Sequence, residues 1–206
     1  MTDNSLFAPQ REDDVLRLIE AQPLAWLTSG QGDSFRATLL PLRPVATTSG
    51  RVTHLVGHIG RSHDHYKLLQ ADGRAWALFL GPHGYIAASW MHDRTWAPTW
   101  NYASAQIGVE LTFYDDPADL KAHLRDLVAA MEKGRPNAWQ IEELGTRYAQ
   151  LSQHIIGFRA EVKEIRAKFK LGQDERDTIL EDIRRNLKET GAAELLAWTN
   201  LFNPGR

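Results

Sequence analysis

Residues 79–102 constrain the fold of this chain more than any other stretch. The segment reads Phe-Leu-Gly-Pro-His-Gly-Tyr-Ile-Ala-Ala-Ser-Trp-Met-His-Asp-Arg-Thr-Trp-Ala-Pro-Thr-Trp-Asn-Tyr and contains three of the seven tryptophans. We expect an apolar strand that ends at Phe79, a turn at Gly81-Pro82, and a second extended piece from Tyr85 to Trp90. Pro98 has no backbone donor, so it should precede a third strand that starts at Thr99.

The two faces of this third strand differ in chemistry. Thr99 and Asn101 point to one side, and Trp100 and Tyr102 point to the other. The rings favour a core corner filled with aromatic side chains, which is their commoner role. The alternative is a shaped aromatic surface.

Apolar periodicity predicts both strands and helices in the rest of the chain. Strands are expected at residues 24–29, 36–42, 52–58, 74–80, 101–114 and 158–162, and helices at 11–21, 65–69, 115–131, 146–155, 174–190 and 192–198. The irregular phase of residues 52–58 suggests a β-bulge.

Two short segments offer groups that suit an anion. Residues 60–64, Gly-Arg-Ser-His-Asp, supply backbone N–H groups, a hydroxyl and an arginine ahead of a helix. Loops of this kind also cap helices without any ligand. Residues 163–170 carry four basic side chains against one acid, and Lys168 and Lys170 share one strand face. These lysines could bind a phosphate, or they could be a solvated sheet edge that prevents aggregation with another sheet.

Composition narrows the class of protein. The 206 residues, with 43% apolar and 24% charged side chains, fit one domain or a domain with a small appendage. No apolar run approaches the length of roughly 20 residues that spans a bilayer, and residues 1–5 lack signal-peptide features. Cysteine is absent, which excludes disulfides and thiol catalysis. We therefore expect a cytoplasmic protein without a membrane partner.

The charge balance and the motifs exclude further classes. A net charge of −2 gives no general attraction to nucleic acid, so direct nucleic-acid binding is not expected. No nucleophilic triad, paired-carboxylate motif or nucleotide-binding glycine pattern is present. His63 and His65 have a spacing that suits a metal or haem iron, whereas His54 and His58 are too far apart on a strand for one small ion.

Several motifs resemble those of one family. They are Ala37-Thr38 with Leu40-Pro41-Leu42, Gly57-His58-Ile59 with Arg61, Gly81-Pro82-His83-Gly84-Tyr85-Ile86, Ser89-Trp90, Pro98-Thr99-Trp100-Asn101-Tyr102, Ile156-Gly157-Phe158, and Lys168-Phe169-Lys170-Leu171 with Gln173. Together they resemble the PaiB-like FMN-binding negative transcriptional regulator family, from about Phe7 to about Leu187. The Pro-Thr-Trp-Asn-Tyr and Lys-Phe-Lys-Leu runs are the most specific.

This resemblance implies a fold and a cofactor. The fold would be α+β: an antiparallel, Greek-key-like split β-barrel with peripheral helices, similar to pyridoxine-phosphate-oxidase-like flavoproteins. Residues 1–173 would form the barrel domain and residues 174–206 a C-terminal helical extension packed on it. FMN would bind at a homodimer interface, in a flavin-dependent oxidoreductase or a flavin-binding regulator of transcription.

The resemblance also assigns cofactor-binding positions. The strand at residues 36–41 and the loop at residues 58–62 would hold the phosphate and ribityl groups. They contribute Arg36, Thr38, Leu39, Leu40, Pro41, His58, Arg61 and Ser62. Trp100 and Asn101 would line the flavin, and Lys168, Lys170 and Gln173 would approach from the late basic segment. A dianionic phosphate needs arginine, lysine or N–H donors, and an isoalloxazine needs a flat apolar wall.

Departures from the family pattern leave two other functions open. Leu39 replaces a histidine, Gln106 stands where a histidine is common, and Asp174 puts a negative charge near the proposed phosphate. An interaction module with a degenerate flavin pocket is one alternative. A haem-binding or haem-degrading protein is the other, with His58, His63 or His83 as the axial ligand.

Overall fold

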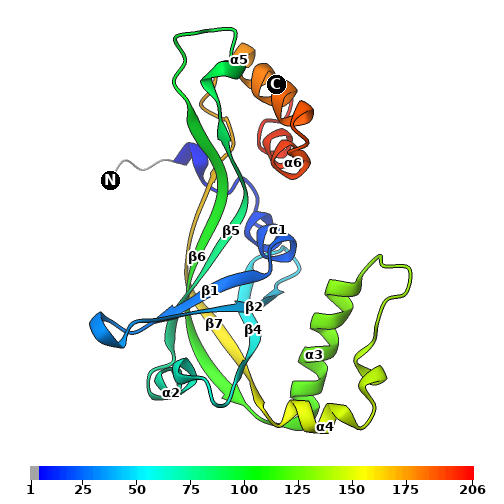
Figure 1. Ribbon diagram of the computed structural model, residues 1–206. Coiled ribbons are helices and arrows are strands. Elements are labelled where there is room, and N and C mark those ends of the chain that lie inside the picture. The colour runs from blue at the N-terminus through cyan, green and yellow to red at the C-terminus, as the bar shows by residue number, and fades with distance from the viewer. Residues whose placement is uncertain (1–4) are drawn as a thin grey trace.

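Seven antiparallel strands form one sheet in the computed structural model, which describes residues 5–206 (Figure 1). The strands are β1 (Leu24–Ser29), β2 (Arg36–Pro41), β3 (Arg43–Ala46), β4 (Val52–Gly60), β5 (Arg74–Ile86), β6 (Thr99–Tyr114) and β7 (Ile155–Lys170). Their order is β2-β1-β5-β6-β7-β4-β3, and β2 also approaches β4, so the sheet curls towards closure. The predicted α+β split β-barrel is confirmed.

Most helices lie at the two ends of the long β5–β6 ribbon, whereas α1 lies beside its middle (Figure 1). They are α1 (Asp14–Ala21), α2 (Asp64–Ala71), α3 (Pro117–Glu132), α4 (Arg147–Ser152), α5 (Asp177–Glu189) and α6 (Ala193–Phe202), with short 3-10 turns η1 (Ser5–Phe7), η2 (Gly32–Ser34), η3 (Ala88–Trp90) and η4 (Ile141–Leu144). Helices α5 and α6 cover one end, and α2, α3 and α4 lie at the other. No helix in residues 5–206 is both long and apolar enough to cross a membrane.

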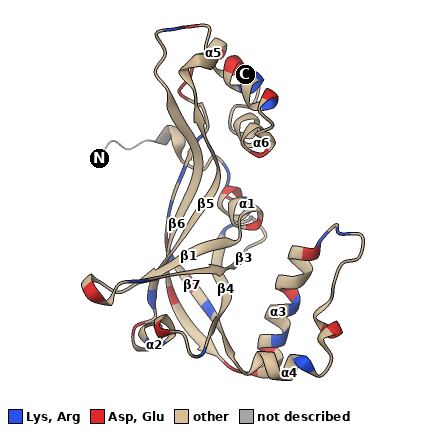
Figure 2. Ribbon diagram, viewed as in Figure 1, with Lys and Arg blue, Asp and Glu red and all other residues tan. Residues whose placement is uncertain are grey.

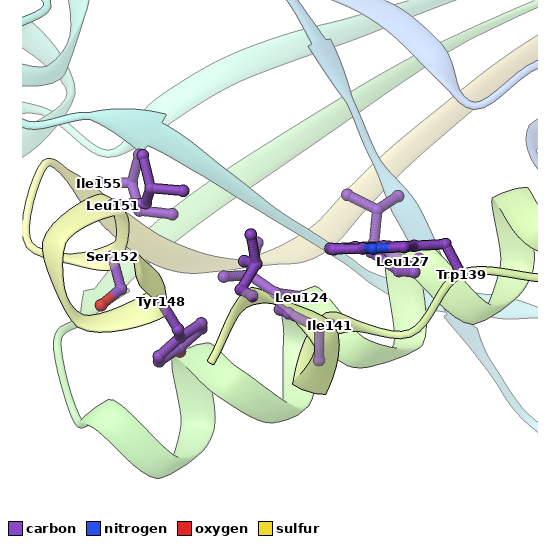
Figure 3. Close-up of a pocket in the computed structure, with 10 residues that line it drawn as sticks. Leu124, Leu127, Trp139, Ile141, Tyr148, Leu151, Ser152 and Ile155 are labelled. Atoms are coloured by element: carbon purple, nitrogen blue, oxygen red, sulfur yellow. The ribbon is translucent and has the colours of Figure 1, made fainter. Parts of the chain in front are cut away.

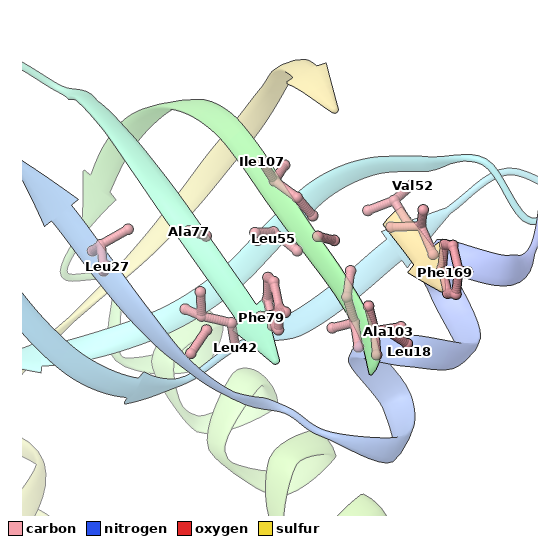
Figure 4. Packing of buried hydrophobic residues seen from close by; sticks show 14 of the residues in the cluster. Leu18, Leu27, Leu42, Val52, Leu55, Ala77, Phe79, Ala103, Ile107 and Phe169 are labelled. Atoms are coloured by element: carbon pink, nitrogen blue, oxygen red, sulfur yellow. The ribbon is translucent and has the colours of Figure 1, made fainter. Parts of the chain in front are cut away.

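The core forms because alternate strand residues point inward. Leu27, Ala77 and Ile107 lie side by side on β1, β5 and β6 and are fully buried. Leu18 of α1 closes the core next to Phe79 and Ala103 (Figure 4). Burying a leucine, isoleucine or phenylalanine side chain contributes about 1.5–3 kcal/mol.

The C-terminal helices join the same apolar cluster. Phe169 of β7 stacks on Phe202 at a centroid distance of 4.8 Å and on Trp198 at 5.8 Å. Ile179 and Ile183 of α5 are buried in the cluster as well. The described extension therefore packs on the barrel, while the domain boundary at residue 173 stays a prediction.

The sequence reading was wrong at Gly81-Pro82, where β5 does not turn. The strand continues to Ile86 through a bulge: Leu80 pairs with Ser104, and His83 pairs with Tyr102. The extra residue on β5 removes the need for a ladder N–H at Pro82. The predicted extended piece to Trp90 is also wrong beyond Ile86, because residues 88–90 form η3.

Other boundaries differ by smaller amounts. Strand β3 was not predicted, and its Pro44 is tolerated because β3 lies at the sheet edge. Residues 155–170 form one strand, so α4 is shorter than expected and ends at Ser152. The bulge expected in residues 52–58 is confirmed by the register shift between β3 and β4.

Candidate functional site

The first group of predicted residues lies where β2 meets the start of α2. The hydroxyl of Thr38 is 2.7 Å from Nδ1 of His65, whose Nε2 is 2.9 Å from the hydroxyl of Ser29. His65 is fully buried. Burial, with smaller effects of His63 and Arg36, lowers the pKa of His65 to about 4. A neutral imidazole thus joins β1, β2 and α2.

This corner presents two arginines and a hydroxyl, beside the exposed carboxylates of Asp33 and Asp64. Arg36 donates from Nη1 to the carbonyls of Asp33 at 3.0 Å and Phe35 at 2.8 Å, and its side chain is exposed. Arg61 lies 4.0 Å from Asp115, too far for a firm ion pair. Ser62 is exposed in the turn before α2. This corner can hold an anion.

His58 faces a different neighbour. Its Nδ1 is 3.1 Å from Nε2 of His123 on α3. Burial lowers the pKa of His58, and burial together with His58 lowers the pKa of His123 to about 4. The His58 ring therefore lies against α3 rather than beside Arg36. Leu40 and Pro41 are half-buried and shape the strand.

The second group lies at the far end of β6. Trp100 is 54% exposed and its ring centroid is 5.9 Å from that of Tyr85 on β5. Asn101 faces the other way, is buried, and its Nδ2 has no hydrogen-bond partner among residues 5–206. The predicted alternation along the strand is confirmed. The rings form an exposed aromatic surface rather than the core corner that seemed the commoner outcome.

The late basic segment approaches this aromatic surface. Lys170 donates to the hydroxyl of Thr99, and the Lys168 ammonium lies 5.5 Å and 5.9 Å from the ring centroids of Phe7 and Tyr102. Beyond Glu161, β7 pairs with β6 alone within the described chain, so one edge of the segment is open. Gln173 accepts from the amide of Leu171 at 2.7 Å and donates to the carbonyl of Phe169, so it shapes the turn after β7.

The two groups are far apart within one chain. Thr38 lies in register with Leu27, Ala77 and Ile107 across β1, β5 and β6. Trp100 is seven residues further along β6, which at roughly 3.3 Å per residue is on the order of 23 Å. Trp100 is thus distant from the corner of its own chain, whereas Lys168, which pairs with Ser104, is only three residues from the Ile107 row.

An exposed apolar surface lies between the two groups. Trp26 pairs with Leu39 on one side and with Leu78 on the other, and side chains opposite one another in a sheet share a face. Trp26 is 50% exposed, and Leu24 and Leu80 are each 54% exposed. We call Leu24, Trp26, Leu39, Leu78 and Leu80 the apolar face. Patches of this kind usually mark interaction sites.

A pocket between α3, η4 and α4 does not suit a nucleotide. Helices α3 and α4 with η4 enclose about 230 Å³ lined by leucine, isoleucine, valine, Trp139, Tyr148 and Ser152 (Figure 3). No cationic group lines it. The residues at the β2–α2 corner and at the aromatic end of β6 fit FMN better: cations for phosphate at one, flat rings for an isoalloxazine at the other.

Comparison with known families agrees with this chemistry. The family described as "Putative FMN-binding domain" matches residues 1–164. The chain belongs to this FMN-binding family. Membership confirms the predicted PaiB-like relationship and supports FMN as the cofactor.

Curated relatives of the FMN-binding family share about a quarter of their residues with the matched part of this chain. The protease synthase and sporulation protein PAI 2 of Bacillus subtilis (strain 168) is 27% identical over 126 residues, covering 61% of this chain and 60% of that protein. An uncharacterized protein of Aspergillus fumigatus is 27% identical over 139 residues, covering 55% and 53%. The chain thus spans little more than half the length of these relatives.

Solved structures show the same fold at low identity. The flavocytochrome Anf3 of Azotobacter vinelandii is 16% identical with a TM-score of 0.59, covering 81% of this chain and 74% of that one. The FAD and heme binding protein of Mycobacterium smegmatis is 17% identical with a TM-score of 0.56, covering 86% and 80%. These similarities establish architecture.

The sequence did not single out three residues that the structure places in these regions. Tyr85 pairs with Trp100, Ser29 contacts His65, and His123 contacts His58. Tyr85 could have been found from the pairing of adjacent strands. No local signal identifies His123, because it reaches the sheet from a helix 65 residues away.

Proposed function

We propose that this protein is a homodimeric flavoprotein that holds FMN between two protomers. One observation carries the proposal: cations and aromatic rings that suit a flavin nucleotide lie at opposite ends of a strand ribbon, joined by an unpartnered apolar face. Two copies related by a two-fold axis would place the corner of one beside the rings of the other.

The roles of the residues follow from their chemistry. Arg36 and Arg61 would bind the phosphate, with the N–H groups and hydroxyl near Ser62. Trp100 and Tyr85 of the second copy would lie against the isoalloxazine, with Lys168 at its edge. The apolar face would exclude water from the cofactor and bury the interface.

Bound FMN would supply hydride or electron transfer, while the chain supplies orientation and electrostatics. We favour a flavin-dependent oxidoreductase over a regulator that reads DNA. Figure 2 shows acidic and basic positions dispersed over the molecule, and the net charge is −2. Reduction of bound flavin by a nicotinamide cofactor would support the enzyme. Failure with every donor would favour a flavin-binding regulator.

The test of cofactor binding is the visible spectrum of the protein after incubation with FMN and desalting. A retained flavin band is expected, and Arg61→Ala or Lys168→Ala should weaken it. Arg147→Ala is the control, because Arg147 is exposed on α4 and is not among the predicted cofactor residues. Loss of flavin from the unmodified protein would contradict the proposal and favour an interaction module.

Mixing variants tests whether one site uses two chains. Arg36→Ala and Lys168→Ala proteins, each defective alone, are denatured together and refolded as heterodimers. If each site takes Arg36 from one chain and Lys168 from the other, a heterodimer has one intact and one doubly altered site. Recovery of about one flavin per heterodimer, or half a flavin per chain, is expected, and no recovery would place both residues in a site within one chain.

Haem remains a second candidate because of His83. Its ring is exposed, and Nδ1 lies 2.9 Å from the carbonyl of Gly81, which leaves Nε2 free. Iron-binding histidines commonly fix their other nitrogen in this way. A Soret band that survives desalting and disappears in His83→Ala would establish haem binding.

A further inference from the structure

A hollow of about 700 Å³ lies between α3 and the sheet, in the size range of small-molecule sites. Arg43, Val56 and Arg159 line it from β3, β4 and β7, and Asp119, His123 and Asp126 line it from α3. Figure 1 shows α3 standing beside the sheet at the end opposite α5 and α6. None of the predicted cofactor residues lines this hollow.

The two arginines occupy one row of the sheet. Arg43 pairs with Val56, and Val56 pairs with Arg159. Residues in such a row point to the same face, and two strand spacings separate the outer Cα atoms by about 10 Å. Two guanidinium groups therefore flank Val56 on the sheet side of the hollow.

The charges in the hollow are not neutralised by ion pairs. Within residues 5–206, no salt bridge within 4.0 Å involves Arg43, Arg159, Asp119, Asp126 or Lys133, which also lines the hollow. Most other charged clusters of the molecule do form such pairs, for example Lys163 with Glu110 and Glu161. The side chains of Asp119, Asp126, Lys133 and Arg159 are exposed, so their charges are accessible to a ligand that enters the hollow from solvent.

The arrangement of these charges selects a ligand class. Guanidinium groups bind carboxylates through paired hydrogen bonds. The carboxylates of Asp119 and Asp126 on the facing helix would repel a second negative group and attract an ammonium group. Small apolar residues between them, Val45, Val56, Ala129 and Ala130, suit a short hydrocarbon.

We propose that the hollow between α3 and the β3–β4–β7 face binds a small zwitterion. Its carboxylate contacts Arg43 and Arg159, and its ammonium group contacts Asp126. The site is separate from the proposed flavin site and does not depend on it.

Calorimetric titration with a series of ω-amino acids from glycine to 6-aminohexanoate tests the proposal on the full chain. At least one member should bind, and the matched carboxylate and amine of the same chain length should each bind more weakly. Arg159→Gln and Asp126→Asn should each weaken binding at least about tenfold, the effect of losing about 1.4 kcal/mol of charge-assisted hydrogen bonding. Arg147→Gln is the matched control and should leave the affinity unchanged.

Amide chemical shifts of labelled protein locate the ligand. Changes in the amide chemical shifts of Arg43, Val56 and Arg159 on titration with the zwitterion would support the site. This result does not depend on whether FMN is retained in the spectroscopic test. The proposal would be overturned if no member of the series saturates the protein at millimolar concentration. Equal binding of the zwitterion to both altered proteins and to the control would overturn it as well.

Discussion

The Nδ1 atom of His92 lies 2.6 Å from Oδ1 of Asp182, and the backbone amide of His92 donates to Oδ2 of the same carboxylate at 2.8 Å. Asp182 is buried on α5, while His92 belongs to the loop between η3 and β6. Trp96 also donates from this loop to Glu175 at 2.8 Å. The loop that leads into the aromatic end of β6 is thus fastened to the C-terminal extension.

Replacing Asp182 should therefore destabilise the protein. In Asp182→Asn the charge is lost, and one side-chain oxygen cannot replace both contacts with His92. We expect a loss of about 1–3 kcal/mol in the free energy of unfolding, measured with urea at pH 7. Glu181→Gln, at an exposed neighbouring position on the same helix, should change stability little.

The pH dependence of that loss has a definite sign. Burial would raise the pKa of Asp182, but hydrogen bonds from the His92 amide, Arg185 and the His92 ring hold it below its usual value. The stabilisation is present above the pKa of an unfolded aspartate, about 3.9, and is lost as the pH falls through the folded pKa. A difference between the two proteins that disappears between pH 8 and 5 would contradict this account.

The buried His65 should make the free energy of unfolding depend on pH in a second way. Its pKa in the folded protein is about 4, mainly because of burial, whereas an unfolded histidine titrates near 6.5. Between these values the unfolded chain binds the additional proton, so stability falls as the pH is lowered. We expect His65 to lower the free energy of unfolding by about 1–3 kcal/mol between pH 7 and 4.5.

Comparison with His65→Gln isolates this contribution. The altered protein should be less stable at pH 7, since contacts to Thr38 and Ser29 are disturbed, and its stability should fall less steeply with acid. His123→Gln should reduce the slope in the same direction, because burial and His58 also lower the pKa of His123 to about 4. Parallel pH profiles for all three proteins would exclude buried neutral histidines as the cause.

The sequence predicted most strands because their alternation and turn residues are local signals. It failed at Gly81-Pro82, where the local turn signal is overridden by pairing with β6 on the far side of a bulge. It also left open whether Trp100 packs in the core, since burial of a strand face depends on which elements cover it. In the structure α5 and α6 pack against the Asn101 side, and Trp100 stays exposed.

The cofactor-binding role of the candidate site residues stays a prediction. Motif likeness pointed to Arg36, Arg61 and Lys168, but their separation along the ribbon follows from strand register, which no motif encodes. The hollow beside α3 was not predicted at all. It combines residues from β3, β7 and a helix that are distant in the sequence.

Gly81 should be intolerant of a side chain. A Cβ at this position would overlap Cδ1 of Leu18 and lie 3.3 Å from the carbonyl oxygen of Ala103. Leu18 is fully buried, so it has little room to move. We expect Gly81→Ala to lower the free energy of unfolding by about 1–3 kcal/mol, the usual effect of overpacking.

A double-mutant cycle with Leu18→Ala tests the proposed cause. Removing the leucine methyl groups opens space for the new Cβ, so Gly81→Ala should be less destabilising in that background. Additive losses would show that the bulge backbone, rather than contact with α1, requires glycine.

The apolar face leads to a prediction about assembly. Trp26 is half exposed near the centre of this face, paired with Leu39 and Leu78. Light scattering should give the native protein a mass of twice the 23.3 kDa of the chain. Trp26→Glu places a charge where the interface would exclude water, so this variant should be monomeric while its circular dichroism stays unchanged.

Leu151→Glu is the matched control, because Leu151 is 47% exposed but lies on α4, outside the apolar face. It should remain dimeric and retain flavin, whereas monomeric Trp26→Glu should lose flavin on desalting. A monomeric Trp26→Glu protein that keeps FMN would show that one chain suffices to bind the cofactor. A dimeric one would place the interface elsewhere on the barrel, because a buried unpaired carboxylate is too costly to tolerate at the centre of a dry interface.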